Sequence, residues 1–255
     1  GLPVPPGFCV TTAAFSAFVD EAPGFEDLRA QLDQLDSTDL AGVRQLAGRL
    51  RQLLCQTPVP QAIREAIATA VDAVDHEGAY AVRSSATLED LPDASFAGQQ
   101  DTYLNVRGIA EICRHVRACW ASLFTDRAVI YRRQQGYDSK AARLSVVIQR
   151  MIPAEISGIA FTADPVTQHR HVCAIDASYG LGEALVSGEA SPDHDELARR
   201  NGQWEATQLA GDTPALSPAE RDQIARAAVE AGSKDIAMST SPSFSSCCCT
   251  DSFAG

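Results

Sequence analysis

The chain has 255 residues, a hydrophobic content of 45% and a formal net charge of −12. This length and apolar content suffice for one large core or two smaller ones. The acidic balance argues against nucleic acid as a partner, because phosphate backbones require a basic surface, whereas a single nucleotide needs only a locally positive cradle. No apolar run reaches the roughly 18 residues of a membrane span, and no signal peptide opens the chain. The sequence therefore predicts a cytoplasmic location without a membrane partner.

The first third of the chain carries helical patterns. Apolar residues recur at three-to-four spacing in three stripes, which begin at Leu28, Val43 and Ile63. The stretch Gln56–Pro60 interrupts them with two prolines. Two short strands are expected to follow, at 80–84 and 101–106.

The middle of the chain predicts one long helix and then strands. Apolar residues from Ile109 to Ile130 lie on one helical face, and Gly136 suits the residue that follows the helix. Strand patterns cover 143–152, 157–164 and 171–180. The sequence Ser-Pro-Ala-Glu at Ser217–Glu220 is a capping box, so a helix is expected from there to about Glu230. Helices first and strands later favour an α+β fold.

The last residues, 239–255, differ in composition from the rest. Serine, threonine and cysteine dominate them, and no apolar period is present. The sequence predicts a disordered tail there. No Cys-x-x-Cys pair occurs among the eight cysteines, so neither a zinc site nor a disulfide framework is expected.

A candidate phosphate-binding segment follows the first predicted strand. Arg83 offers a planar fork of donors that suits phosphate oxygens. After an acidic turn, the small-residue loop around Gly98 could place backbone amides over phosphates, and Thr102 begins the next strand. Alternatively, Arg83 pairs with Glu89 or Asp90, and Gly98 only makes a turn.

Two further positions could contact a nucleotide. Glu183 lies in a glycine-rich stretch at 177–193, where it could bind a ribose hydroxyl or a metal ion; the alternative is a plain glycine-rich turn. Gln149 ends an apolar strand, and its amide could contact an adenine edge. The alternative is a core glutamine bonded to backbone groups.

Five segments, in this order, resemble the N-terminal nucleotide-binding domain shared by phosphoenolpyruvate synthase, pyruvate phosphate dikinase and rifampin phosphotransferase. They are GLPVPPGFCVTTAAF, AVRSSATLEDLPDASFAGQQDTYLNV, CWASLFTDRAVIYR, VVIQRMIPAEISGIAFTADPVT and IDASYGLGEALVSGEASPD. The resemblance covers roughly residues 1–193, and its wording is most similar to rifampin phosphotransferase. It implies an ATP-grasp fold with a helical N-terminal part and a mixed or antiparallel sheet.

The resemblance also implies a function and site residues. The domain would bind ATP with Mg2+ and pass a phosphoryl group to a histidine on a separate domain, which carries it to an acceptor. Arg83 matches the family's phosphate-binding arginine, and Gly98 and Thr102 match the loop that closes over the nucleotide. Gln149 matches the adenine contact, and Glu183 matches a residue facing the ribose.

The chain departs from the family pattern at both ends. The family begins earlier, with a lysine that contacts phosphate, and Ala237 stands where a magnesium-binding glutamate is expected. No Gln-Ser-Arg-Pro segment follows, and the phosphohistidine and acceptor domains are not in this sequence. We therefore expect an incomplete ATP-grasp domain at 1–238, with weakened Mg2+ binding and no complete turnover by this chain alone. The alternatives are a phosphoenolpyruvate synthase fragment and a non-catalytic nucleotide-binding module.

Overall fold

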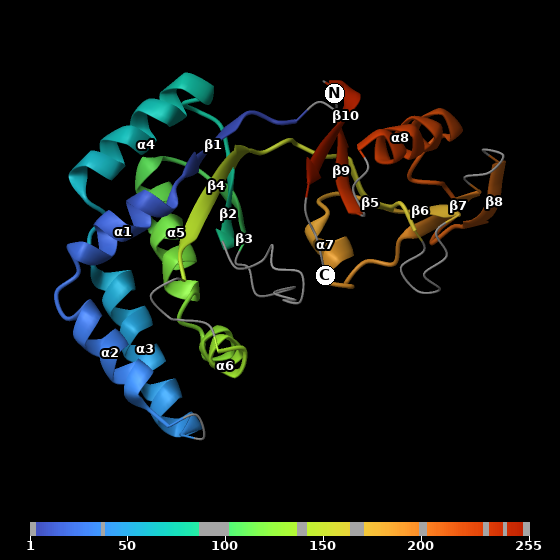
Figure 1. The fold of residues 1–255 in the computed structure, drawn as a ribbon. Coiled ribbons are helices and arrows are strands. Elements are labelled where there is room, and N and C mark those ends of the chain that lie inside the picture. Colours follow the sequence, from blue (N-terminus) through green and yellow to red (C-terminus); the bar gives the residue numbers. More distant parts are fainter. Residues whose placement is uncertain are drawn as a thin grey trace. The chain divides into compact units, whose positions relative to one another are not determined.

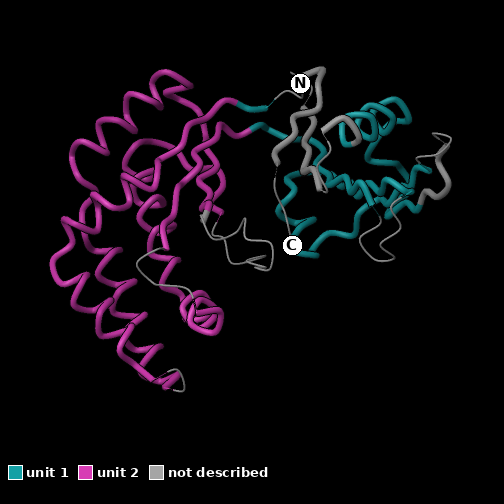
Figure 2. Tube along the Cα trace, in the orientation of Figure 1, with its two compact units in different colours: residues 1–5, 152–254 teal, residues 6–151, 255 magenta. Residues whose placement is uncertain are grey.

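The structure, a computed structural model, describes residues 4–36, 39–86, 102–136, 142–163, 171–198, 203–231, 235–241 and 244–251. Figure 1 shows the elements in chain order. The chain divides into two units, coloured separately in Figure 2. Unit 1 consists of residues 1–5 and 152–254, and unit 2 consists of residues 6–151 with residue 255.

Unit 2 contains a four-stranded sheet and most of the helices. The sheet has the strand order β1-β4-β2-β3, and every pairing in it is antiparallel. Its strands are β1 (Gly7–Val10), β2 (Tyr80–Ala86), β3 (Thr102–Val106) and β4 (Leu144–Arg150). Its helices are α1 (Thr12–Asp20), α2 (Phe25–Gln34), α3 (Leu40–Gln56), α4 (Gln61–Val74), α5 (Ile109–Ser122) and α6 (Asp126–Gln134).

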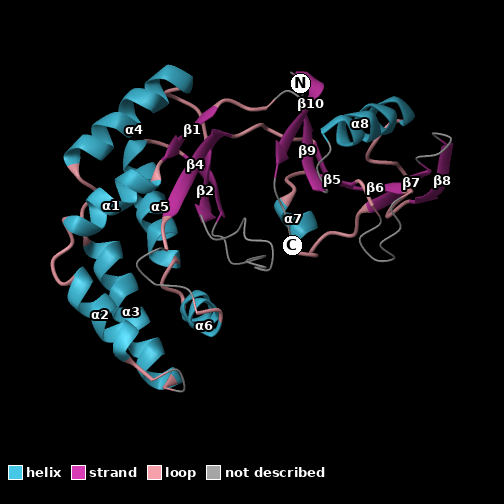
Figure 3. Cartoon of the chain, viewed as in Figure 1, coloured by secondary structure: helices cyan, strands magenta, loops and turns pink. Residues whose placement is uncertain are grey.

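Helices α1, α4 and α5 pack on one face of this sheet (Figure 3), and α3 packs on α5 and contacts α2 and α6. Successive side chains of a strand point to opposite faces, and the buried side chains of β4 alternate accordingly, whereas in β2 Ala81 is buried as well as Tyr80 and Val82. The residues on the helix side share one core with Trp120 of α5: Tyr80, Val82, Val146 and Ile148. Phe18 of α1 stacks on Trp120 with 4.6 Å between the ring centroids.

The long helix predicted from residue 109 to Gly136 is wrong, because the structure breaks it between α5 and α6. Thr125 caps α6 with its side chain, which accepts a hydrogen bond from the backbone amide of Ala128 at 3.3 Å. Buried Arg132 donates to the carbonyl of Leu123, and Arg51 donates to the carbonyl of Phe124 at 2.6 Å. These two arginines, one from α6 and one from α3, satisfy carbonyls that the break leaves outside the helix. Apolar periodicity cannot reveal such contacts.

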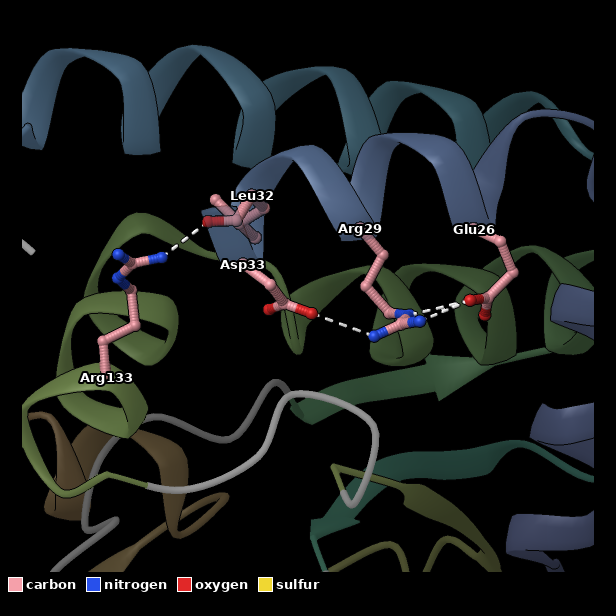
Figure 4. Close-up of polar contacts among 5 residues, drawn as sticks. All are labelled: Glu26, Arg29, Leu32, Asp33 and Arg133. Atoms are coloured by element: carbon pink, nitrogen blue, oxygen red, sulfur yellow. Dashed lines mark hydrogen bonds and ion pairs between the residues drawn. The ribbon is translucent and has the colours of Figure 1, made fainter. Parts of the chain in front are cut away.

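Two arginines stabilise α2, one through ion pairs within the helix and one from α6 (Figure 4). Arg29 is 7% exposed and pairs with Glu26 and Asp33 on the same helix, the latter at 3.0 Å. Arg133 of α6 donates to the carbonyl of Leu32 at 2.6 Å and also to the carbonyl of Leu35. Cations near a helix C-terminus interact favourably with its unpaired carbonyls, so Arg133 ties α6 to the end of α2.

Unit 1 contains a six-stranded antiparallel sheet with the strand order β10-β9-β5-β6-β7-β8. Its strands are β5 (Ile156–Phe161), β6 (Val172–Tyr179), β7 (Asp193–Ala198), β8 (Gln203–Gln208), β9 (Asp235–Ser241) and β10 (Phe244–Asp251). Its helices are α7 (Glu183–Val186) and α8 (Pro218–Ala231). Helix α8 packs on β5 and β6, where Ala160 and Ile175 share a core with Ile224.

Two buried carboxylates of β7 organise the chain around α8. Asp193 accepts hydrogen bonds from the backbone amides of Ala210 at 2.7 Å and Ala215 at 2.6 Å. Asp195 pairs with Arg221 of α8 at 2.6 Å, with 4% of the Asp195 side chain exposed. Buried charges are tolerated when they are paired and hydrogen-bonded. Asp193 and Asp195 are two residues apart, so they point to the same face of β7. Together they attach both the loop before α8 and α8 itself to this strand.

The α+β prediction is confirmed, and the sheets are antiparallel. The C-terminal residues differ from the expected disordered tail, because β10 pairs with β9 from Phe244 to Asp251. A hairpin ladder is made by backbone groups, so the missing apolar period on which the prediction rested does not prevent pairing.

Candidate functional site

Three of the predicted site residues lie on one face of the four-stranded sheet. Thr102 of β3 is directly opposite Arg83 of β2, and Arg83 is opposite Val147 of β4. Gln149 is two residues beyond Val147 on the same strand, so it shares that face. We call this the open face: it carries Gly7, Cys9, Ala81, Arg83, Ser85, Thr102, Ser145, Val147 and Gln149, and it is the face opposite the helix-covered core.

The register sets the spacing of these three side chains. Directly opposite residues have Cβ atoms about 4.5–5.5 Å apart, and diagonal neighbours are about 7–8 Å apart. Arg83 and Thr102 are an opposite pair, whereas Arg83 and Gln149 are diagonal neighbours. One ligand of nucleotide size can therefore contact the guanidinium, the hydroxyl and the amide together.

Arg83 is the charged group of the open face. Its side chain is partly buried, and this burial lowers the pKa of Arg83 from its usual value. A guanidinium keeps its charge at neutral pH nonetheless. Because the group is partly removed from water, its hydrogen bonds to an anion are stronger than those of an arginine in bulk solvent.

Glu183 belongs to unit 1, so the structure does not group it with the other three. It is exposed and begins α7, directly after the glycine-rich loop. The amide of Gly180 donates to the carbonyl of Glu155 at 2.7 Å, and the Ser157 hydroxyl donates to the carbonyl of Gly180 at 2.7 Å. Gly180 has φ +91°, a conformation that favours glycine. The loop that presents Glu183 is thus attached to β5.

Gly98 lies outside the described residues, as do Glu89 and Asp90. The proposed closing loop and the alternative pairing of Arg83 with the acidic turn therefore stay predictions.

A polar cluster on unit 1 was missed by the sequence reasoning. On the face opposite α8, His194 of β7 contacts Asp176 of β6 at 2.6 Å through Nδ1 and Glu196 at 3.2 Å through Nε2. Asp176 and His194 are directly opposite in the register. The spacing of His194 and Glu196 on one strand is the only sequence signal for this cluster, because the third member comes from another strand.

The cluster predicts a pH-dependent stability of unit 1. Burial lowers the pKa of His194, but hydrogen bonds and attraction to Asp176 and Glu196 outweigh it, so the pKa is raised. The stabilisation is fully present below the unfolded-state pKa of about 6.5 and is lost as the pH rises through the raised folded value. Hydrogen exchange of β6 and β7 amides should therefore accelerate on going from pH 6 to pH 8, after correction for intrinsic exchange. His194→Gln should remove this pH dependence, and an unchanged slope in that variant would contradict the assignment.

The described residues hold no group of three or more histidine, cysteine, aspartate or glutamate side chains arranged to bind a metal ion. His194 does not provide one, because its two carboxylate partners occupy its two different ring nitrogens. Ala237, where the resemblance leads one to expect a glutamate, is opposite Ile159 in the β9–β5 register.

The α+β fold, with a partly buried arginine beside a hydroxyl and an amide on the open face, fits the class of nucleotide-binding domains. Comparison with known proteins agrees: the sequence profile of the pyruvate phosphate dikinase AMP/ATP-binding domain matches residues 1–239. The chain belongs to this family.

Individual relatives support the same assignment. The chain is 53% identical over 216 residues to a rifampicin phosphotransferase from Streptomyces sp. The aligned region covers 85% of this chain and 25% of the relative. The chain is 50% identical over 193 residues to a rifampicin phosphotransferase from Bacillus subtilis, covering 76% of this chain and 22% of the relative. A probable phosphoenolpyruvate synthase from Methanocaldococcus jannaschii is 42% identical over 198 residues, covering 76% and 17% respectively. The higher identities to rifampicin phosphotransferases confirm the resemblance read from the motifs.

The chain spans about a quarter or less of the length of these relatives. Within the described part of the chain, no helix is both long and apolar enough to cross a membrane.

Proposed function

We propose that residues 1–238 form a nucleotide-binding domain that holds ATP on the open face of unit 2. The juxtaposition of Arg83 and Thr102 on paired strands, with Gln149 diagonal to Arg83, is the observation that carries this proposal. Arg83 binds the phosphates, Thr102 donates a hydroxyl hydrogen bond to them, and the Gln149 amide contacts the adenine edge. Family membership supports ATP as the ligand.

Within a longer protein, the domain provides the phosphoryl donor site of a dikinase-type phosphotransferase. The phosphoryl group passes to a histidine on another domain and then to an acceptor. The identities favour rifampicin as the acceptor over pyruvate, the substrate of a phosphoenolpyruvate synthase. Such transfer depends mainly on positioning and charge stabilisation, so this chain's part is to bind and orient ATP in the cytoplasm.

Two further assignments depend on the family resemblance. Gly98 supplies backbone amides to the nucleotide, and Glu183 contacts the ribose. Mg2+ neutralises phosphate charge when it is bound, and it usually takes one or two carboxylates with the substrate's phosphates. Because alanine stands at position 237, we propose that Mg2+ enters with ATP and contributes less to affinity than a full carboxylate set provides.

A non-catalytic nucleotide-binding module is the second candidate function. The alanine at position 237 favours it, because a weakened metal site reduces transfer more than it reduces binding. Both candidates predict saturable ATP binding, and they differ in whether AMP forms when the remaining domains of the relative from Streptomyces are added.

The experiment is a calorimetric titration of the full chain with ATP, with and without Mg2+. We expect saturable binding of one ATP per chain, with a small dependence on Mg2+. A folded, monodisperse sample that takes up no ATP in either condition would refute the proposal.

A further inference from the structure

The two residues directly opposite Gln149 on the open face have almost no side chains. Gly7 of β1 is opposite Gln149 on one side, and Ala81 of β2 is opposite on the other. The row Gly7–Gln149–Ala81 therefore crosses three adjacent strands and presents one amide, one methyl group and bare backbone.

Gly7 is required by the close approach of β1 to β4. The amide of Arg150 donates to the carbonyl of Pro6 at 2.9 Å, which makes Gly7 and Gln149 a non-hydrogen-bonded pair. In such pairs the Cα atoms are only about 4.5 Å apart. A Cβ on Gly7 would lie 2.5 Å from the carbonyl oxygen of Ile148 and 2.9 Å from the Cα of Gln149. Both atoms belong to the backbone and cannot move aside cheaply.

Ala81, on the other side of Gln149, adds only a methyl group to the surface beside the amide. It is 8% exposed and lies beside Arg83 on the same strand and face. A larger residue here would place its side chain about 4.5–5.5 Å from the Cβ of Gln149, where a ligand's base must lie to reach the amide.

We propose that Gly7 and Ala81 determine the specificity of the site, because they form a flat seat on which a planar purine base lies against the Gln149 amide. Ligand sites combine mainly apolar groups with a few polar groups that fix the ligand's orientation, and the row supplies both. The proposal rests on the proposed function and adds the residues that select the base, whereas Arg83 in the next row binds the phosphates.

The test compares ATP with inorganic tripolyphosphate, which has the phosphates but no base, by calorimetric titration of the full chain. Ala81→Val should weaken ATP binding by about tenfold or more and leave tripolyphosphate binding unchanged, which also shows that the variant is folded. Ala81→Ser, which adds little bulk, should bind both ligands like the wild type. Ala66→Val, the same change at an exposed position of α4, is the matched control.

The remaining outcomes overturn the inference in distinguishable ways. Wild-type ATP affinity in Ala81→Val, or equal losses for both ligands, would show that Ala81 does not seat the base. A wild type that binds ATP no more tightly than tripolyphosphate would support the phosphate site but contradict the base site. A wild type that binds neither ligand would refute the proposed function, and the inference would fall with it.

Discussion

Replacing Arg83 by alanine is expected to weaken ATP binding by roughly 100-fold to 1,000-fold, the loss that corresponds to about 3–4 kcal/mol. A guanidinium donates two parallel hydrogen bonds to phosphate oxygens, and each hydrogen bond to a charged group contributes about 1.5–3 kcal/mol. The partial burial of Arg83 places this site toward the upper part of that range. Titration calorimetry of wild type and variant measures the difference directly.

Two control variants separate charge, geometry and folding. Arg83→Lys keeps the positive charge but loses the planar fork, so its affinity should lie between those of the wild type and Arg83→Ala. Arg49→Ala removes the same charge from an exposed position of α3 and should leave ATP affinity unchanged. Arg83→Ala with wild-type affinity would mean that the open face is not the phosphate site.

Replacing Asp195 by alanine is expected to destabilise unit 1 by about 3–5 kcal/mol, because it leaves Arg221 largely buried without its closest carboxylate. The two groups are 2.6 Å apart, and their side chains are only 4% and 15% exposed. Since the pair joins β7 to α8, hydrogen exchange should accelerate in both elements. The amides of α3 and α5 in unit 2 should keep their protection.

The double variant Asp195→Leu with Arg221→Leu tests the physical cause. It removes both charges at once, so its cost should be much smaller than that of Asp195→Ala. Asp212→Ala, in the exposed loop before α8, controls for the loss of one negative charge. If the double variant proves as unstable as Asp195→Ala, the loss comes from packing rather than from an unpaired charge.

Much of the local structure could be predicted because periodicity reports which side of an element is apolar. The helices α3 and α4, the strands β4, β5 and β6 and the capping-box start of α8 lie where the patterns place them. Ser217 and Glu220 form the expected reciprocal hydrogen bonds, with the Ser217 amide donating to Glu220 at 2.8 Å. Short elements such as β1, β7 and β8 were not predicted, because a few residues carry too little period to distinguish strand from loop.

The candidate site, like the fold, could be predicted only in part. The residue types at Arg83 and Gln149 allowed phosphate and base contacts beside plain structural alternatives. Five sequence segments in order indicated the family, which the comparisons confirm. That Arg83 and Thr102 are opposite one another depends on the register of β2 and β3, including the irregularity before Val82. A one-residue slip in register would send one of the two to the other face.

The sequence by itself determined the family and the α+β class, and it supplied the residue types proposed for nucleotide contacts, because these depend on residue identity and spacing along one chain. Only the tertiary structure decided which residues share a face: Gly7 and Ala81 beside Gln149, Asp176 beside His194, and Arg132 beside the carbonyl that the α5–α6 break exposes. These contacts join residues of different strands, or of a helix and the turn before it, and strand register and helix packing create them only when the chain has folded.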